Sequence, residues 1–451
     1  MKTVIKPPVA ILGFGVEGQS AFEFLKTQGV FDITICDEKE SIELPENTKS
    51  QIGSSAFENL TDFKTIIRSP GVHYNLPGIL KARNAGCTIT SMTELTLETA
   101  ANRLTAVTGS NGKTTTTGMI ERILRAHYGN EIIVGGNDRK PVLEEALSKP
   151  WPVLLEVSSF QFADLKMSPH ISVVLNITPN HLDWHENEED YIHAKTNLIT
   201  HQTPNDWAVL NSANENSSKL ADKAPGQIFW LNKKPARRGG GGKAWSMWKG
   251  NKLFAQFGNE AVEILTKEDL TLKTHPDNIL AAVAVSLLHG ASPLTIKKAL
   301  AEFRGVEHRL EFVREINGIK FYNDSACTTP ESAIVATQQF PKGKLILLLG
   351  GSTKHSDFSF MAHHIAETNT RVYLYGAEGE RIAEAMKTEG AENLILHLDT
   401  TRDFQKIIKE ALSLAQSGDN IVLSPACASF DMFRNAKERG KNFKKIIENL
   451  K

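Results

Sequence analysis

The segment Leu104–Thr116 reads LTAVTGSNGKTTT. It opens with a short apolar run that predicts a buried strand, continues into a loop with Gly109 and Gly112, and ends where a helical pattern begins. In such loops backbone N–H groups cradle phosphates, the lysine meets the β- and γ-phosphates, and the next hydroxyl binds Mg²⁺. The common spacing GxxxxGK[ST] would place a glycine where Val107 stands, so the loop is a shortened TGxxGKT form. We interpret it as an ATP site inside an α/β domain.

Outward from this loop, short apolar runs alternate with segments of helical periodicity, which is typical of βαβ units around parallel sheets. The pattern is lost between residues 205 and 265, where we expect a surface hairpin with a flexible tip. We expect strands at residues 9–13, 33–37, 65–68, 104–108, 153–157, 173–177, 310–313, 319–323, 345–349, 372–375, 394–396 and 420–423. We expect helices at residues 19–28, 76–85, 115–126, 277–288 and 293–303.

Length and composition limit the class of protein. At 451 residues the chain has room for about three domains. A net charge of −1 argues against a protein that holds nucleic acid by bulk electrostatics. The apolar runs are too short to cross a membrane, the first residues lack a signal-peptide pattern, and the four scattered cysteines indicate free thiols. We therefore expect a cytoplasmic protein without a membrane or nucleic-acid partner.

A second glycine-rich turn precedes the phosphate loop. Residues Val9–Gly18 read VAILGFGVEG, which fits a strand followed by GxGxxG, and Asp37 ends the next predicted strand. This pattern alone would suit an NAD-dependent oxidoreductase, but such a turn brings N–H groups to the pyrophosphate of any nucleotide. The turn Ser69–Gly71 follows a later strand at the same edge of the sheet.

Candidate metal ligands follow the strands beside the phosphate loop. Glu156 ends one predicted strand, and Asn180, His181 and Asp183 follow the next. Oxygen ligands at one sheet edge beside a triphosphate suit Mg²⁺. Lys195 lies on the helix after that loop, where a lysine by itself would be an ordinary solvated side chain.

Together with these segments, several further motifs occur in order along the chain, and the whole set resembles the Mur ligase superfamily. These are ATP-dependent amide-forming enzymes of peptidoglycan precursor synthesis, related to folylpolyglutamate synthetase. The motifs are TGSNGKTTT (108–116), GGN (135–137), EVSSFQ (156–161), NITPNHLDWH (176–185), YIHAK (191–195), EHRLE (307–311), NDS (323–325), GGSTK (350–354) and SPACASFDMF (424–433).

The resemblance implies three α/β domains. These are a Rossmann-like UDP-substrate domain at residues 1–102, a central P-loop ATPase-type domain with a mostly parallel sheet at 103–306, and a Rossmann-like amino-acid-binding domain at 307–451. The SSFQ form, the short first domain and the SPACASFDMF segment are most similar to the branch that adds D-glutamate to UDP-N-acetylmuramoyl-L-alanine. The resemblance thus implies these two substrates, ATP and two Mg²⁺ ions as cofactors, and a monomer.

The resemblance also implies roles for individual residues. ATP contacts fall on Gly109, Ser110, Asn111, Gly112, Lys113, Thr114, Thr115, Asn278, Arg309 and Asp324. UDP-substrate contacts fall on Gly15, Val16, Glu17, Gly18, Asp37, Ser69, Pro70, Gly71, Asn137, Ser158 and Gln161. Amino-acid contacts fall on Thr328, Lys354 and Ser429. The catalytic set is Lys113, Glu156, His181 and Lys195, and the metal ligands are Thr114, Glu156, His181 and Lys195 as a carbamate.

The family's lysine is carbamylated, which supplies oxygen ligands to Mg²⁺ where an ammonium would repel it. The implied reaction activates a carboxylate as an acyl phosphate, which an amino group then attacks, and it implies closure of the C-terminal domain.

Four segments depart from the pattern of the D-glutamate branch. Ala326, Cys327 and Thr329 stand where the family has lysine, alanine and asparagine, and Asn180 stands where it has aspartate. The family's adenine segment has the pattern HN…N, whereas residues 274–278 read THPDN here. Ala436 stands where the family commonly has an aromatic residue. The amino acid is therefore open, and a Mur-type ligase for another amino acid or a folylpolyglutamate synthetase-like enzyme remains an alternative. An NAD-dependent oxidoreductase and a non-catalytic nucleotide-binding module are the more distant ones.

Overall fold

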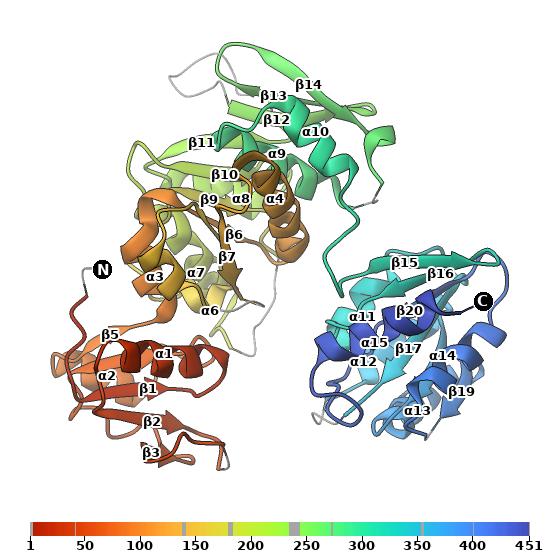
Figure 1. Ribbon diagram of the computed structural model, residues 1–451, viewed down its shortest axis with the longest axis horizontal. Helices are drawn as coiled ribbons and strands as arrows, with labels where there is room; N and C mark the ends of the chain where they lie inside the picture. The colour runs from red at the N-terminus through yellow and green to blue at the C-terminus, as the bar shows by residue number, and fades with distance from the viewer. Residues whose placement is uncertain are drawn as a thin grey trace. The chain divides into compact units, whose positions relative to one another are not determined.

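The computed structural model describes residues 3–40, 42–137, 141–178, 184–233, 244–271, 274–352, 356–399 and 401–450. The chain forms two compact units, residues 1–303 and 304–451 (Figure 1). The first unit holds two sheets and the second holds one. Helices connect mostly parallel strands in each sheet, so the predicted α/β class is confirmed. None of the described helices has the length and apolar content needed to span a bilayer.

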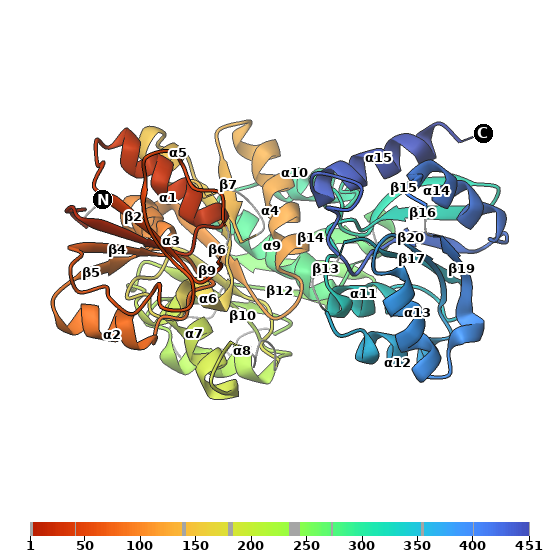
Figure 2. The ribbon, with the colours of Figure 1, turned by 90° about the horizontal axis from the view of Figure 1, so that it is seen from below.

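The first sheet is parallel, with strand order β3-β2-β1-β4-β5. Val9 and Ile11 of β1 pack with helix α1 on one face, whereas Ala10 and Leu12 pack with α2 on the other, as period-two strand geometry requires (Figure 2). The strands are β1 (Val9–Leu12), β2 (Ile33–Asp37), β3 (Lys49–Ile52), β4 (Thr65–Arg68) and β5 (Thr88–Thr90). The helices are α1 (Val16–Thr27), α2 (Pro77–Asn84) and α3 (Met92–Ala100).

The second sheet has nine strands in the order β14-β13-β12-β11-β10-β9-β6-β8-β7. Its strands are β6 (Leu104–Thr108), β7 (Ile133–Gly136), β8 (Val153–Glu156), β9 (Ile171–Val174), β10 (Trp207–Asn211), β11 (Gln227–Leu231), β12 (Ala244–Lys249), β13 (Lys252–Phe257) and β14 (Ala261–Thr266). Its helices are α4 (Lys113–Tyr128), α5 (Leu143–Ser148), α6 (Ser159–Phe162), α7 (Glu188–Thr200), α8 (Glu215–Lys219), α9 (Pro276–Leu288) and α10 (Pro293–Ala301). Short 3₁₀ turns lie at Ala101–Arg103, Leu220–Lys223 and Lys267–Asp269.

The expectation of a single surface hairpin between residues 205 and 265 is wrong. Strands β10 and β11 extend the sheet in parallel, β12 pairs with β11, and β13 and β14 add an antiparallel meander. Their alternating polar and apolar residues suit an edge region with one solvated face, which has no long apolar run to reveal it. The tip of the expected hairpin, including residues 239–242, lies outside the described residues.

The third sheet has the order β15-β16-β20-β17-β18-β19, and only β15 runs antiparallel to its neighbour. Alternate residues of β17 pack against α11, α12 and α13 on one face and against α14 and α15 on the other (Figure 2). The strands are β15 (Glu311–Ile316), β16 (Ile319–Asn323), β17 (Leu345–Gly350), β18 (Arg371–Tyr375), β19 (Ile395–Asp399) and β20 (Asn420–Leu423). The helices are α11 (Pro330–Thr337), α12 (Ser359–Thr368), α13 (Gly379–Thr388), α14 (Phe404–Ser413) and α15 (Ala436–Glu448), with a 3₁₀ turn at Glu392–Leu394.

Candidate active site

The phosphate loop connects β6 to α4 at the carboxyl edge of the central sheet. Every residue of β6 is buried, and Gly112 caps the helix in the left-handed region at φ 87°. The Lys113 Nζ donates hydrogen bonds to the carbonyl oxygens of Gly109, at 2.9 Å, and Ser110, at 3.2 Å. The ammonium thus lies over the loop at the N-terminus of α4, the end of a helix that favours an anion.

Gly112 also allows a close approach from helix α9. A β-carbon at this position would overlap the Asn278 side-chain amide, and the left-handed φ also favours glycine, so glycine suits the close approach of the two segments. The structure therefore places Asn278 directly against the loop, although 166 residues separate it from Gly112 in the chain. Thr115 lies half-buried in the first turn of α4.

Thr114, in the first turn of α4, meets Glu156 at the end of β8. The Thr114 hydroxyl donates a hydrogen bond of 2.9 Å to Glu156 Oε1. Glu156 is the last residue of β8, which pairs in parallel with β6, and its side chain is buried. A hydroxyl and a carboxylate beside a phosphate loop are oxygen donors of the kind that Mg²⁺ prefers.

Lys195 projects from α7 toward the carboxyl end of β6 and is buried, with 2% of its surface exposed. Its Nζ donates a hydrogen bond of 3.2 Å to Thr108 Oγ1 and lies 4.8 Å from the centroid of the Tyr191 ring. Burial holds the pKa of the Lys195 amine well below its usual range, and the nearby charge of Lys113 lowers it further.

The loop after β9 is bonded to the phosphate loop. Ser110 Oγ donates to the Thr178 carbonyl and accepts from the Thr178 N–H, both at 2.9 Å. The backbone N–H of Asn111 donates to Asn176 Oδ1 at 2.9 Å, and Asn176 Nδ2 donates to the backbone carbonyl of Asn111 at 3.0 Å. The predicted ligand His181, together with Asn180 and Asp183, follows at once but lies outside the described residues.

The first glycine-rich turn is shaped by three contacts. Gly13 adopts φ 79°, and a β-carbon on Gly18 would overlap the Gly13 carbonyl, so helix α1 can approach β1 only with glycine there. Asp37 accepts hydrogen bonds from the N–H groups of Phe14, at 2.7 Å, and Lys39, at 3.0 Å. Asp37 therefore braces the turn through backbone contacts.

The start of α1 and the turn Ser69–Gly71 lie next to each other, and part of their surface is exposed. Gly15 and Val16 are exposed at the start of α1. The Ser69 hydroxyl donates to the Gly13 carbonyl at 2.7 Å, which joins the second turn to the first, and Pro70 is half-buried. The Gly71 carbonyl accepts from the Trp184 indole at 3.4 Å.

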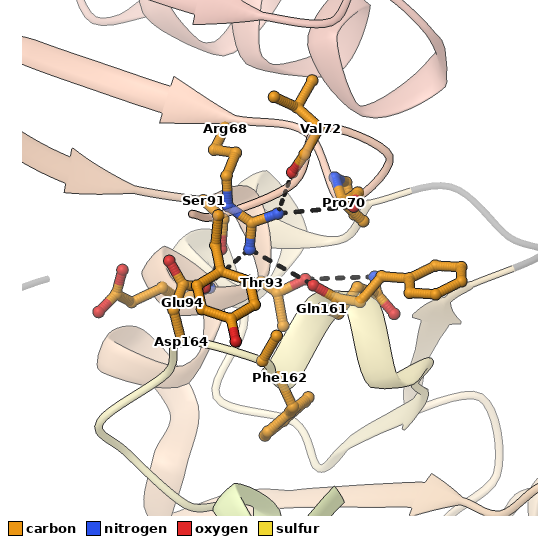
Figure 3. Close-up of polar contacts among 12 residues, drawn as sticks. Arg68, Pro70, Val72, Ser91, Thr93, Glu94, Gln161, Phe162 and Asp164 are labelled. Carbon is orange, nitrogen blue, oxygen red and sulfur yellow. Dashed lines mark hydrogen bonds and ion pairs between the residues drawn. The ribbon is translucent and has the colours of Figure 1, made fainter. Parts of the chain in front are cut away.

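Arg68, at the end of β4, connects the first sheet to the central domain. Its guanidinium donates to the Val72 carbonyl at 2.8 Å and to Asp164 Oδ1 at 2.7 Å, and it points between them in Figure 3. Weaker bonds of 3.4 Å reach the carbonyls of Ser69 and Phe160. One side chain thus holds the 69–72 turn against the residues of α6 and the turn after it.

Glu17 and Gln161 form a second link between the two sheets. Gln161 Nε2 donates to Glu17 Oε1 at 2.8 Å and to Thr93 Oγ1 at 3.2 Å. Gln161 Oε1 accepts from the Ser158 N–H at 3.0 Å in a capping box at the start of α6. Burial raises the pKa of Glu17 to about 7, although the Gln161 bond and the Arg68 charge act in the opposite direction.

Asn137 follows β7 beside this link. Its N–H donates to the Glu156 carbonyl at 2.8 Å, so it starts at the same sheet edge as the predicted metal ligand. The structure therefore gathers the predicted muramoyl-side residues Asn137, Ser158 and Gln161 on two neighbouring strand ends.

The remaining predicted residues belong to the unit of residues 304–451. Asp324 accepts from the Leu310 N–H at 3.2 Å and from the Ser424 hydroxyl at 2.7 Å. Burial raises the pKa of Asp324 to about 7, although the charge of Arg309 lowers it. Thr328 is half-buried and Ser429 is buried, each on a loop that follows a strand end of the third sheet. Lys354 lies outside the described residues.

Two residues that sequence reasoning left without a role stand out in the structure. Arg68 was visible beside the Ser69–Gly71 turn, but nothing in the sequence marks its partner Asp164. Arg439 shares a buried helix face with Phe443 and Ile447 at intervals of four residues, and an arginine in an apolar stripe is the signal that could have identified it.

Comparison with known proteins adds the family. A family model described as the Mur ligase middle domain matches residues 107–285. The model of the Mur ligase glutamate ligase domain matches residues 308–427, and that of the MurD-like N-terminal domain matches residues 7–91.

Curated relatives match over the whole length. The UDP-N-acetylmuramoylalanine–D-glutamate ligase of Symbiobacterium thermophilum is 36% identical, with 98% of each chain covered. The protein of the same name from Acetivibrio thermocellus is 34% identical over 100% of this chain and 98% of its own.

Solved structures with low sequence identity share the fold. A UDP-N-acetylmuramate–alanine ligase from Thermotoga maritima has a TM-score of 0.57 at 19% identity and covers 98% of this chain and 99% of its own. A MurF ligase from Thermotoga maritima in complex with ADP has a TM-score of 0.52 at 18% identity, with coverages of 99% and 96%.

Proposed function

The chain belongs to the Mur ligase family, and from that membership we propose that it joins D-glutamate to UDP-N-acetylmuramoyl-L-alanine with conversion of ATP to ADP and inorganic phosphate, a step of peptidoglycan precursor synthesis. The observation that carries this proposal is the full-length similarity to D-glutamate ligases, 36% identity over 98% of both chains. The geometry around the phosphate loop supports it, because that geometry suits transfer of a phosphoryl group.

The reaction must first activate a carboxylate, which is a poor electrophile. A carboxylate oxygen of the muramoyl-L-alanine attacks the γ-phosphorus of ATP, the bond to the β-phosphate oxygen breaks, and an acyl phosphate and ADP result. The amino group of D-glutamate then attacks the acyl carbon through a tetrahedral intermediate and loses a proton to solvent. Inorganic phosphate leaves with the former carboxylate oxygen, and an amide remains.

The phosphate loop serves the first step. Lys113 lies over the loop carbonyls, and we propose that its ammonium turns to the γ-phosphate and offsets the charge that develops there. The N–H groups of Gly112, Thr114 and Thr115, at the start of α4, would hold the remaining phosphate oxygens. We propose that Asn278, packed against Gly112, contacts ATP from α9 and that Arg309 and Asp324 contact it from residues 307–451.

The donor set beside the loop fits a magnesium ion, because a hydroxyl and a buried carboxylate converge there. We propose that Thr114, Glu156, His181 and carbamylated Lys195 hold two Mg²⁺ ions, which would neutralise phosphate charge when bound.

Lys195 is suited to carbamylation. A neutral amine, and not an ammonium, adds to carbon dioxide with formation of an N–C bond and loss of a proton. Burial lowers the pKa of Lys195, which favours the neutral amine over the ammonium. We propose that the resulting carbamate serves as a metal ligand.

The three segments would divide the substrates between them. Residues 1–102 would bind the UDP part through two turns: Gly15, Val16, Glu17 and Gly18 with Asp37 behind them, and Ser69, Pro70 and Gly71. Residues 103–306 would bind ATP and, through Asn137, Ser158 and Gln161, the muramoyl side. Residues 307–451 would bring the amino acid to Thr328, Lys354 and Ser429. One chain then supplies every site, so a monomer suffices. We also propose a cytoplasmic enzyme, because both nucleotide substrates, ATP and UDP-N-acetylmuramoyl-L-alanine, are found in the cytoplasm.

A release assay for inorganic phosphate tests the proposal. Release should require ATP, Mg²⁺, UDP-N-acetylmuramoyl-L-alanine and D-glutamate together, and each omission should abolish it. A panel of amino acids addresses the substitutions Ala326, Cys327 and Thr329. Faster release with a different amino acid would overturn the D-glutamate assignment, and no release with any of them would overturn the muramoyl substrate.

A further inference from the structure

Arg439 is a fully buried arginine on helix α15, and its guanidinium bonds two different loops. Its Nε donates to Ser325 Oγ at 3.0 Å, and one terminal nitrogen donates to the Ser325 carbonyl at 3.0 Å and to the Cys427 carbonyl at 3.1 Å. The other terminal nitrogen donates to the Ala428 carbonyl at 3.2 Å. A single side chain thus crosslinks the segments around residues 325 and 428.

These two loops start side by side. Strands β16 and β20 pair in parallel with Asn323 opposite Leu423, so the loops 324–329 and 424–430 leave the sheet at the same carboxyl edge. The first loop carries Thr328 and the second carries Ser429. On these two loops the arginine donates to backbone carbonyls and to the Ser325 hydroxyl, so it defines where the loops run. The side chains of Thr328 and Ser429 are not among these acceptors.

The chemistry of the guanidinium suits this task. A buried charge is costly unless its N–H groups are bonded, and a planar fork with five donors can satisfy several carbonyls in a fixed geometry. Asp324 lies near enough for the charge of Arg439 to act on its carboxyl group, although burial has the larger effect and raises the pKa of that group to about 7. A lysine in the same place has a single nitrogen, so it cannot reproduce the four bonds that the guanidinium spreads over its three nitrogens.

Helix α15 is itself held against the first loop. The Ser325 hydroxyl donates to the Ala436 carbonyl at 2.7 Å. A β-carbon on Gly440 would overlap the ring of His308, so the glycine lets the helix approach the segment that carries Arg309. Arg439 therefore projects from a fixed support.

We propose that Arg439 is a positioning residue for the amino-acid site: it holds the loops 324–329 and 424–430 at the separation that lets Thr328 and Ser429 receive one amino-acid substrate. The inference rests on the proposed function for the identity of that substrate.

The test compares two arginine-to-lysine substitutions in the full-length protein, one at Arg439 and one at a control position. Arg439→Lys should raise the KM for D-glutamate by about tenfold to a hundredfold, as expected for a site misplaced by about 1 Å, with the KM for UDP-N-acetylmuramoyl-L-alanine unchanged. Arg371→Lys is the matched control, because Arg371 pairs with the buried Asp419 at 2.8 Å on the opposite, amino edge of the same sheet. It should lower stability without raising the KM for D-glutamate. Ser325→Ala removes one acceptor and should act like Arg439→Lys more weakly.

Equal KM values for D-glutamate in Arg439→Lys and wild type, or an equal rise in Arg371→Lys, would overturn the proposal. Hydrogen–deuterium exchange provides a readout that does not need the substrate. Exchange in residues 324–329 and 424–430 should increase in Arg439→Lys and not in Arg371→Lys, and unchanged exchange would also overturn it. If wild type does not use D-glutamate, the proposed function fails while the exchange measurement still decides the role of Arg439.

Discussion

Replacement of Arg68 by methionine tests how the UDP-substrate turn is held. The side chain of Arg68 is 2% exposed and that of its partner Asp164 is 17% exposed, so the pair is largely removed from water. Breaking a buried pair by removing one partner costs about 3–5 kcal/mol, because the other charge stays buried. Asp164 retains some water and a second contact of 3.4 Å with Arg83, which places the expected loss at the lower end, about 3 kcal/mol.

Arg83→Met is the matched control. It removes an arginine from the same aspartate, but the Arg83 side chain is 42% exposed, and exposed pairs contribute about 1 kcal/mol or less. The comparison therefore isolates burial, since the partner and the substitution are the same.

Urea unfolding followed by tryptophan fluorescence measures both losses. All six tryptophans fall between residues 151 and 248, so the signal reports on residues 1–303 alone. Arg68→Met should also raise the KM for the UDP substrate, because the freed Val72 carbonyl no longer fixes the 69–72 turn. A loss of stability no larger than that of Arg83→Met would refute this reasoning.

Three further results are expected. Thr114→Val removes a hydroxyl of similar size and should lower kcat by about a hundredfold if the group binds Mg²⁺, whereas a drop in stability with unchanged kcat at saturating Mg²⁺ would contradict the role. Lys195→Ala should lose activity that short carboxylic acids partly restore, and full activity without them would exclude a carbamate. Burial raises the pKa of Glu17 from 4.5 to about 7, so its stabilising effect is complete below pH 4.5 and is lost as the pH rises through 7. Glu17→Gln should abolish the part of the decline in the urea midpoint that wild type shows as the pH rises through 7. Parallel plots of urea midpoint against pH for wild type and Glu17→Gln would argue against the burial of an acid there.

The phosphate loop could be predicted because its information is local. The apolar run before Gly109 specifies the strand, and the glycines with Lys113 specify the turn. Because parallel strands end at one edge, the meeting of Thr114 with Glu156 also follows from order along the chain. The loss of the motif spacing at Val107 did not disturb this geometry.

What could not be predicted depends on contacts between distant segments. The sequence contains Arg68 and Asp164 as two charges among many, and only packing of the first sheet on α6 makes them a buried pair. The strands β12 to β14 lack long apolar runs, because one face of the meander is solvated, so the size of the central sheet stayed hidden. The contact of Asn278 with Gly112 needed the path of α9.

The central claim is an amide ligase that activates a carboxylate with ATP, and an isotope measurement tests it most directly. UDP-N-acetylmuramoyl-L-alanine labelled with ¹⁸O in its carboxylate is turned over with ATP, Mg²⁺ and D-glutamate, and the inorganic phosphate is analysed by mass spectrometry. The account predicts that each phosphate released carries one ¹⁸O from the carboxylate, together with a product whose mass has grown by one glutamyl residue. Phosphate free of the label would show that water and not the carboxylate receives the phosphoryl group, and it would contradict the account.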